Sequence, residues 1–206
     1  MANYRAIELD LLRHGECEGG AIFRGRSDSP LTDAGLAAML EQARACHTEW
    51  DLVFSSPLQR CKHFAERWCR GRDLDVIYDE RLLEIDFGDW EGRSIDAVMR
   101  EQPEHFNAWS ESPDQHPPPN GENLADLTRR VNAFLAELEG LLWDSKVLLV
   151  IHGGVFRAVM QSLLGLPRAH INRLHVPHAC ASRFIVYHYG GTRSVKLLTH
   201  NLGGRL

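Results

Sequence analysis

Two stretches of this sequence each end an apolar run in a histidine and a glycine. They are Leu11-Leu12-Arg13-His14-Gly15 and Val150-Ile151-His152-Gly153-Gly154. Ligands of a parallel α/β sheet bind beyond the carboxyl ends of its strands, so neighbouring parallel strands would bring the two histidines together. The second turn also opens a helix, and the free N–H groups of a helix N-terminus suit an anion. A single histidine at a strand end is more often structural, but the repeated arrangement favours a functional site.

Two charged residues elsewhere are candidates for the same site. Arg60 lies one to two turns into a helix that follows a strand and Ser56. It could point to the same edge, although a solvated surface arginine is an equally good interpretation. Glu84 lies among apolar and aromatic neighbours in the stretch from Leu82 to Trp90. Burial there would raise its pKa and keep it protonated as a general acid, whereas an exposed loop acid is the alternative.

Strands and helices alternate in the pattern that must position these residues. Apolar runs predict strands over 5–12, 51–54, 76–78 and 146–151, and closing strands over 174–176, 182–187 and 195–198. Helices are predicted over 33–47 with Thr32 as cap, from Ser56-Pro57 to 70, and over 94–102, 104–109, 124–142 and 155–164. Pro103 is expected to close the helix over 94–102. Residues 81–85 are predicted to be either extended or one helical turn. The alternation predicts an α/β fold, with a mainly parallel central sheet and helices on both faces.

Length and composition fit one soluble globular domain. The 206 residues favour one large domain or at most two small ones, and neither a repeat nor a linker appears. We expect a single domain over 1–206, in which the proline-rich stretch belongs to a lid-like insertion over roughly 90–123. The net charge of −5 does not indicate nucleic-acid binding. No apolar run approaches the roughly 20 residues that a membrane helix needs. The five cysteines include no C-x-x-C pair, and with no signal peptide they predict reduced thiols in a cytoplasm.

The sequence resembles the histidine phosphatase (phosphoglycerate mutase-like) superfamily along nearly its whole length. Leu12-Arg13-His14-Gly15-Glu16 looks like the R-H-G signature of that family. The resemblance continues in family order through Phe23 to Gly25, Asp28 to Gly35, Ser55 to Arg60, Glu84 to Gly92, Asn120 to Glu122 and His152 to Gly154. Within the superfamily, the compact length and Phe87 to Gly92 look most like the alpha-ribazole phosphatases of cobalamin biosynthesis.

The resemblance implies a fold and a role for each matching residue. The fold is the three-layer, phosphoglycerate mutase-like sandwich. His14 is implied as the nucleophile that becomes phosphohistidine, and Glu84 as the acid that protonates the leaving oxygen. Arg13, Arg60 and His152 are implied to hold the phosphoryl oxygens. Arg24, Gly25 and Gly153 are further candidates for substrate binding.

Elementary chemistry agrees with these implied roles. Phosphoryl transfer spreads negative charge over three oxygens, so cations that position the group carry most of the catalysis. Nearby cations also keep a histidine neutral and nucleophilic. With such a cationic cage no metal or other cofactor is required. The expected partner is a small-molecule phosphate ester, without nucleic acid or membrane, and the oligomeric state is open, with a homodimer as one possibility.

The sequence departs from the family pattern R-H-G-E-[ST]-x-x-N at two positions. Cys17 replaces the hydroxyl residue and Gly20 replaces the asparagine, whose side chain normally contacts phosphate. Arg24 stands where the family often carries a small hydroxyl residue and is a candidate to compensate. These departures concern affinity and substrate identity, and not the reaction class.

Several other interpretations are weaker. Cys17 and Arg24 have six intervening residues, so they do not form the C-x5-R of cysteine phosphatases. His175 and His178 lack a metal-ligand pattern and are interpreted as surface or structural residues, whereas Trp109 is a candidate pocket residue. Rival functions are a phosphoglycerate mutase, a broad-specificity sugar or acid phosphatase, and a non-catalytic binder of phosphorylated ligands. The binder ranks lowest because Arg13, His14, Arg60, Glu84 and His152 are all present.

Overall fold

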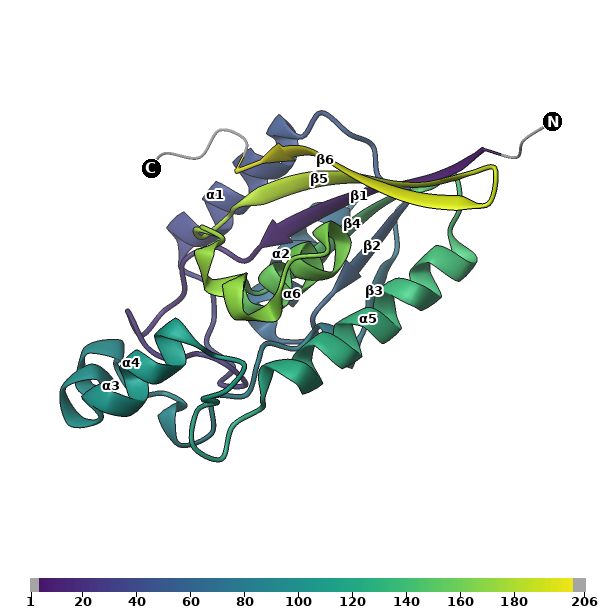
Figure 1. Cartoon of the computed structure of the whole chain (residues 1–206). Helices are drawn as coiled ribbons and strands as arrows, with labels where there is room; N and C mark the ends of the chain where they lie inside the picture. Colours follow the sequence, from purple (N-terminus) through teal and green to yellow (C-terminus); the bar gives the residue numbers. More distant parts are fainter. Residues whose placement is uncertain (1–3, 202–206) are drawn as a thin grey trace.

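A six-stranded sheet forms the centre of the protein (Figure 1), as seen in a computed structural model that describes residues 4–201. Its strands are β1 (Arg5–Arg13), β2 (Leu52–Ser55), β3 (Val76–Tyr78), β4 (Lys146–Ile151), β5 (Ala181–Tyr189) and β6 (Thr192–His200). Their order is β3-β2-β4-β1-β5-β6. β3, β2, β4 and β1 pair in parallel, whereas β5 is antiparallel to both of its neighbours. The predicted mainly parallel sheet is confirmed.

Helices cover both faces of this sheet because alternate strand residues bury on opposite sides. The helices are α1 (Asp33–Ala45), α2 (Gln59–Cys69), α5 (Leu124–Leu141) and α6 (Gly153–Leu164). Leu149 and Ile151 of β4 pack in one core with α5 and α6. Leu148 and Val150 pack in a second core with α1 and α2. The predicted three-layer arrangement is therefore confirmed.

The two histidine-bearing strand ends meet as the sequence predicted. β1 and β4 are parallel neighbours in which Arg13 lies opposite Ile151. The backbone N–H of His14 donates to the carbonyl of Ile151 at 2.9 Å. Both chains therefore leave the sheet side by side at its carboxyl edge.

A smaller helical segment lies beyond this edge, on the side to which the arrow of β1 points (Figure 1). It contains α3 (Ile95–Glu101) and α4 (Pro103–Glu111), preceded by the 3-10 turns η1 (Glu80–Leu82) and η2 (Gly88–Trp90). Ser94 caps α3 by accepting from the N–H of Ala97. We keep the name lid segment for residues 90–123. Whether it moves, and whether it is an insertion in a single domain, stays a prediction.

An aromatic cluster joins the lid segment to the loop after β1. Its members pack with ring centroids 5.0 to 6.4 Å apart, and they are Phe23, Phe87, Trp90, Phe106 and Trp109. Edge-on and tilted ring pairs at such distances add stability beyond their buried area. The cluster forms a small core of its own with Val98.

The structure corrects two of the predicted elements around the site. Residues 174–176 are not a strand, because arginine side chains take their carbonyls: Arg157 donates to Leu174 and Arg13 to Val176. This segment instead follows the 3-10 helix η3 (Arg168–Arg173). α2 begins at Gln59 and not at Pro57, because its first N–H donates to the carboxylate of Asp28 rather than to a serine cap.

Smaller differences concern helix ends. Pro103 opens α4 as well as following α3, which suits a residue whose missing N–H costs nothing in a first turn. α6 begins at Gly153, two residues earlier than predicted. Residues 81–85 form the end of η1, a bend at Leu83 and irregular chain. None of the helices between residues 4 and 201 combines the length and the apolar composition that crossing a bilayer requires.

Candidate active site

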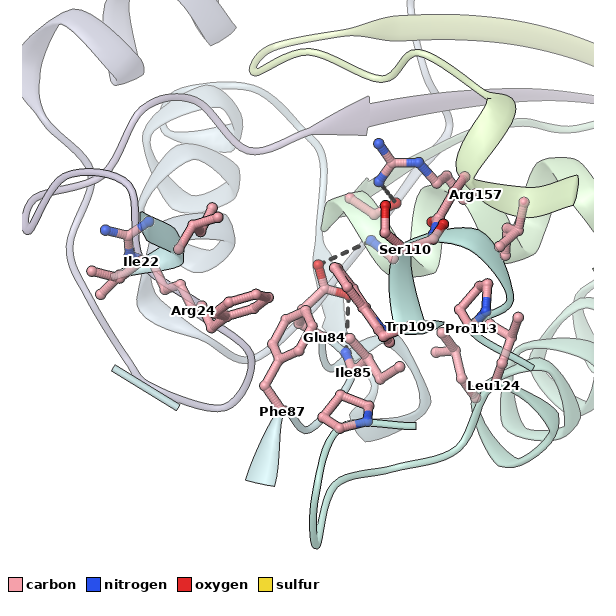
Figure 2. A pocket seen from close by; sticks show the side chains of 18 of the residues that line it. Ile22, Arg24, Glu84, Ile85, Phe87, Trp109, Ser110, Pro113, Leu124 and Arg157 are labelled. Atoms are coloured by element: carbon pink, nitrogen blue, oxygen red, sulfur yellow. Dashed lines mark hydrogen bonds between the residues drawn. The ribbon is translucent and has the colours of Figure 1, made fainter. Parts of the chain in front are cut away.

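A cavity of about 520 Å³ opens at the carboxyl edge of β1 and β4 (Figure 2). Five of the residues predicted for the site line it: Arg13, His14, Arg24, Glu84 and Gly153. The other three, Gly25, Arg60 and His152, lie behind the lining residues. The roles of all eight stay predictions that the following geometry supports to different degrees.

His14 presents one free nitrogen to the cavity. Its Nδ1 lies 2.8 Å from the carbonyl oxygen of Gly15, so Nδ1 carries the proton and donates it. Nε2 is then left with a lone pair. Burial lowers the pKa of His14 well below its usual value, and the charges of Arg13 and Arg60 lower it further. The imidazole is therefore neutral and nucleophilic at neutral pH.

Two guanidinium groups, those of Arg13 and Arg157, converge at Gly153. Arg13 donates from Nη1 to the carbonyl of Val176 at 2.5 Å, while its buried Nε has no partner. Arg157 donates to the carbonyls of Leu174 and Gly153 at 3.0 and 3.2 Å. A Cβ on Gly153 would lie 3.3 Å from Arg13 Nε and from Arg157 Nη1, so both groups approach this glycine closely. Burial lowers the pKa of Arg13 to about 10, which still leaves it charged at neutral pH.

Glu84 sits at the N-terminus of α6 and is 7% exposed. Its carboxylate accepts from the N–H groups of Gly154 at 3.0 Å and Val155 at 3.3 Å, as Figure 2 shows in part. A Cβ on Gly154 would lie 2.5 Å from Glu84 Oε1, so only glycine permits this approach. The expected buried position is found. These hydrogen bonds fix the carboxylate at the start of α6, where it lines the cavity.

His152 and Arg60 form a buried pair behind His14. Arg60 Nε donates to His152 Nδ1 at 3.1 Å, so His152 carries its proton on Nε2 and donates it to Ser56 Oγ at 2.7 Å. The ring of His152 packs edge-on against His14, with centroids 5.2 Å apart. The other Arg60 donors bind the carbonyls of Arg24, Gly25 and Ser27. Direct contact of Arg60, His152 or Gly25 with a phosphoryl group stays a prediction.

Arg24 and Cys17 shape the loop that lacks the family asparagine. Arg24 Nη2 donates to the carbonyls of Glu18 and Gly20 at 2.7 and 2.8 Å, and its buried Nε has no partner. Arg24 thus holds the loop while it lines the cavity. Cys17 Sγ lies 3.6 Å from His14 Nδ1. Burial raises the pKa of the Cys17 thiol, which agrees with its rejection as a nucleophile.

The sequence analysis missed two titratable residues of the cavity, Arg157 and His178. Arg157 follows Gly153 by one helical turn, so the spacing in Gly153-Gly154-Val155-Phe156-Arg157 could have revealed it. His178 was interpreted as surface or structural, yet it lines the cavity with its ring centroid 5.6 Å from that of His14. Burial, Arg13 and Arg24 lower the pKa of His178 to about 4. No pattern marks His178, because the chain around it is irregular.

The floor of the cavity is therefore cationic. Arg13, Arg24 and Arg157 line it, and Glu84 is the one carboxylate among the lining residues. Neutral His14 faces this group. In the part of the chain that the structure describes, no cluster of three or more His, Cys, Asp or Glu side chains is placed to hold a metal ion. The arrangement suits a tetrahedral anion next to an imidazole nitrogen.

Comparison with known proteins identifies the family. The sequence model of the histidine phosphatase superfamily (branch 1) matches residues 9–200. The chain belongs to this superfamily. The predicted family, fold class and enzyme class are thereby confirmed.

The relatives carry different substrate names. Phosphoserine phosphatase 1 of Hydrogenobacter thermophilus is 34% identical over 78% of this chain and 77% of its own length. The adenosylcobalamin/alpha-ribazole phosphatase of Escherichia coli is 33% identical over 85% of this chain and 88% of its own. A mycobacterial glucosyl-3-phosphoglycerate phosphatase superposes with a TM-score of 0.85 at 29% identity, covering 96% of this chain and 99% of that one. These similarities establish the family and leave the substrate open.

Proposed function

We propose that this histidine phosphatase hydrolyses phosphate monoesters through a phosphohistidine on Nε2 of His14. The observation that carries the proposal is the state of His14. Its Nδ1 proton is committed to the Gly15 carbonyl, its pKa is lowered by burial, and its ring lines a cavity with a cationic floor. Such a nitrogen is a nucleophile without needing a base.

In the first step, Nε2 attacks phosphorus and the bond between phosphorus and the ester oxygen breaks. The N–H groups of Arg13, Arg24 and Arg157 that face the cavity stabilise the charge on the phosphoryl oxygens. Glu84 gives the leaving oxygen a proton.

In the second step, water attacks phosphorus and the P–N bond breaks. Glu84, now ionised, takes a proton from that water, and inorganic phosphate leaves. The N–H groups of Gly154 and Val155 hold the carboxylate in position for this step. One carboxylate thus serves as acid and then as base.

Alpha-ribazole 5′-phosphate is our first candidate for the substrate. The similarity to an alpha-ribazole phosphatase over most of both chains supports it. A phosphoglycerate mutase is the second candidate, because it would use the same nucleophile and return the phosphoryl group to the substrate. A cytoplasmic location is also proposed, and all five cysteines being unpaired supports it.

One substrate panel tests these assignments. Release of inorganic phosphate is measured with alpha-ribazole 5′-phosphate, phosphoserine, fructose 2,6-bisphosphate and 3-phosphoglycerate, with His14→Ala as control. We expect His14-dependent phosphate release, fastest from alpha-ribazole 5′-phosphate. Interconversion of 2- and 3-phosphoglycerate faster than phosphate release would instead make the protein a mutase. Tight binding without turnover would make it a binder.

A further inference from the structure

The two halves of the cavity differ sharply in chemistry. The floor carries Arg13 and Arg157 next to β1 and α6, together with Glu84 and with Arg24 of the loop after β1. The opposite wall comes from the lid segment, the loop after η1 and the start of α5. Side chains that line this wall include Ile85, Phe87, Trp109, Pro113, Leu124 and Leu127. We name these six residues the apolar wall.

Figure 2 shows how the apolar wall meets the catalytic end. Trp109, Ile85 and Phe87 lie close around Glu84, with Pro113 and Leu124 beyond them. Glu84 is the residue that faces the ester oxygen in the proposed mechanism. Whatever group carries that oxygen must therefore lie against the apolar wall.

No charged side chain is available on this wall. Between residues 85 and 127, the hydroxyl of Ser110 and the indole N–H of Trp109 are the polar side-chain groups among the described residues that line the cavity, and neither is charged. The cations that line the cavity, Arg13, Arg24 and Arg157, lie outside this range of residues, and two nitrogens of Arg157 already donate to the carbonyls of Leu174 and Gly153. A carboxylate or ammonium placed against the wall would lose hydration without gaining a charged partner.

The volume of the cavity also favours a substrate with a large apolar group. Cavities of roughly 300–1,000 Å³ hold drug-sized ligands, and this one measures about 520 Å³. A three-carbon phosphorylated acid would leave most of that space to water against apolar surface. A larger apolar or aromatic group would displace this water and bury the wall.

We infer that the apolar wall is a leaving-group subsite that selects phosphate monoesters of uncharged alcohols bearing an aromatic or other bulky apolar group. The inference rests on the proposed function for the position of the ester oxygen. It ranks phosphoserine and phosphoglycerate as poor substrates. It favours an ester whose alcohol carries a planar ring system.

Binding of phosphonates tests the subsite without turnover, because their C–P bond is not hydrolysed. We would compare 2-phenylethylphosphonate, ethylphosphonate and the carboxylate-bearing 3-phosphonopropionate by calorimetry. Burial of the phenyl group should make the first bind about tenfold or more tightly than the second. 3-Phosphonopropionate should bind no better than ethylphosphonate. Equal affinity of the first two, or tighter binding of the third, would overturn the inference.

Two residues of the aromatic cluster provide a matched pair of variants. Trp109 lines the cavity, whereas Phe106 packs in the same cluster on α4 and does not. Trp109→Ala should reduce the preference for the phenyl compound about fivefold or more, and Trp109→Phe should keep most of it. Phe106→Ala should leave the preference within about twofold. An equal loss in Phe106→Ala would show a structural effect and contradict the inference.

Turnover separates this inference from the proposed function. 2-Phenylethyl phosphate, ethyl phosphate and phosphoserine are all esters of primary alcohols, so their ratios report mainly on binding. Failure to hydrolyse any of them, with the phosphonate preference intact, would refute the proposed function alone. Hydrolysis of all three in a His14-dependent manner, with phosphoserine best, would refute the apolar subsite alone.

Discussion

His14 and His152 occupy the same place, one residue beyond the ends of the parallel neighbours β1 and β4, yet their surroundings differ. His14 donates from Nδ1 to a backbone carbonyl and turns a bare Nε2 to the cavity. His152 accepts at Nδ1 from Arg60 and donates from Nε2 to Ser56. Equivalent positions in the sequence thus yield opposite tautomers. The comparison teaches that the partner of the first nitrogen decides what the second can do.

The difference between the two histidines can be tested by replacing each of them in turn, and His14 should show the larger effect. His14→Ala should lower kcat by about a thousandfold or more, because it removes the nitrogen that forms the P–N bond. Steady-state phosphate release with ethyl phosphate measures the loss. Activity within tenfold of the unmodified protein would refute the nucleophile assignment.

The second largest loss of activity is expected on replacing Glu84, and its size should depend on the leaving group. Glu84→Gln removes the proton donor but keeps the shape, so kcat/KM for alkyl phosphates should fall by about 10² to 10⁴. Aryl phosphates such as p-nitrophenyl phosphate need less proton assistance and should lose far less. Kinetics on both ester classes decide the matter, and equal losses would count against an acid role.

Replacing His152 should lower kcat less than replacing His14 does, because His152 lies behind the residues that line the cavity. His152→Gln should reduce kcat by about 10- to 100-fold, since Arg60 loses one partner while the nucleophile remains. Rapid quench should still detect phosphorylated protein. A loss as large as in His14→Ala, with no phosphorylated protein formed, would mean that the two histidines are functionally equivalent.

The last prediction concerns the tautomers of the two histidines in the unmodified protein, which NMR can observe. ¹⁵N NMR at pH 6 should find both rings neutral, with the proton on Nδ1 of His14 and on Nε2 of His152, because burial and the neighbouring arginines lower both pKa values. A histidine of ordinary pKa near 6.5 would be mostly protonated there. The unfolded chain takes up these protons, so the free energy of unfolding should fall as pH drops below 6.5. Matching tautomers or an imidazolium at either position would contradict the structure.

The frame of the site was predictable from the sequence. Two apolar runs that end in His14 and His152 predict parallel neighbours, and their meeting follows from strand pairing alone. The resemblance to a family supplied Glu84 and Arg60, which spacing left ambiguous between buried and surface positions. Burial of both is now explained, by the N–H groups of α6 for Glu84 and by loop carbonyls for Arg60.

The features of the site that could not be predicted from the sequence come from irregular segments of the chain. His178 and the carbonyl of Val176 reach the site from a segment that resembles a strand in composition. Arginine side chains, and not strand neighbours, take its hydrogen bonds, and such long-range pairing leaves no periodic pattern. The apolar wall is likewise assembled from several loops and helices, so only Trp109 was foreseen as a part of it.

The most direct test of the account is to identify which nitrogen of which histidine becomes phosphorylated. The protein would be quenched in alkali within milliseconds of mixing with a ³²P-labelled ester, since phosphohistidine survives base. Peptide mapping and comparison with the two phosphohistidine isomers would then locate the label. We predict Nε2-phosphohistidine at His14. Label on Nδ1, on His152 or His178, or on Cys17 would contradict it.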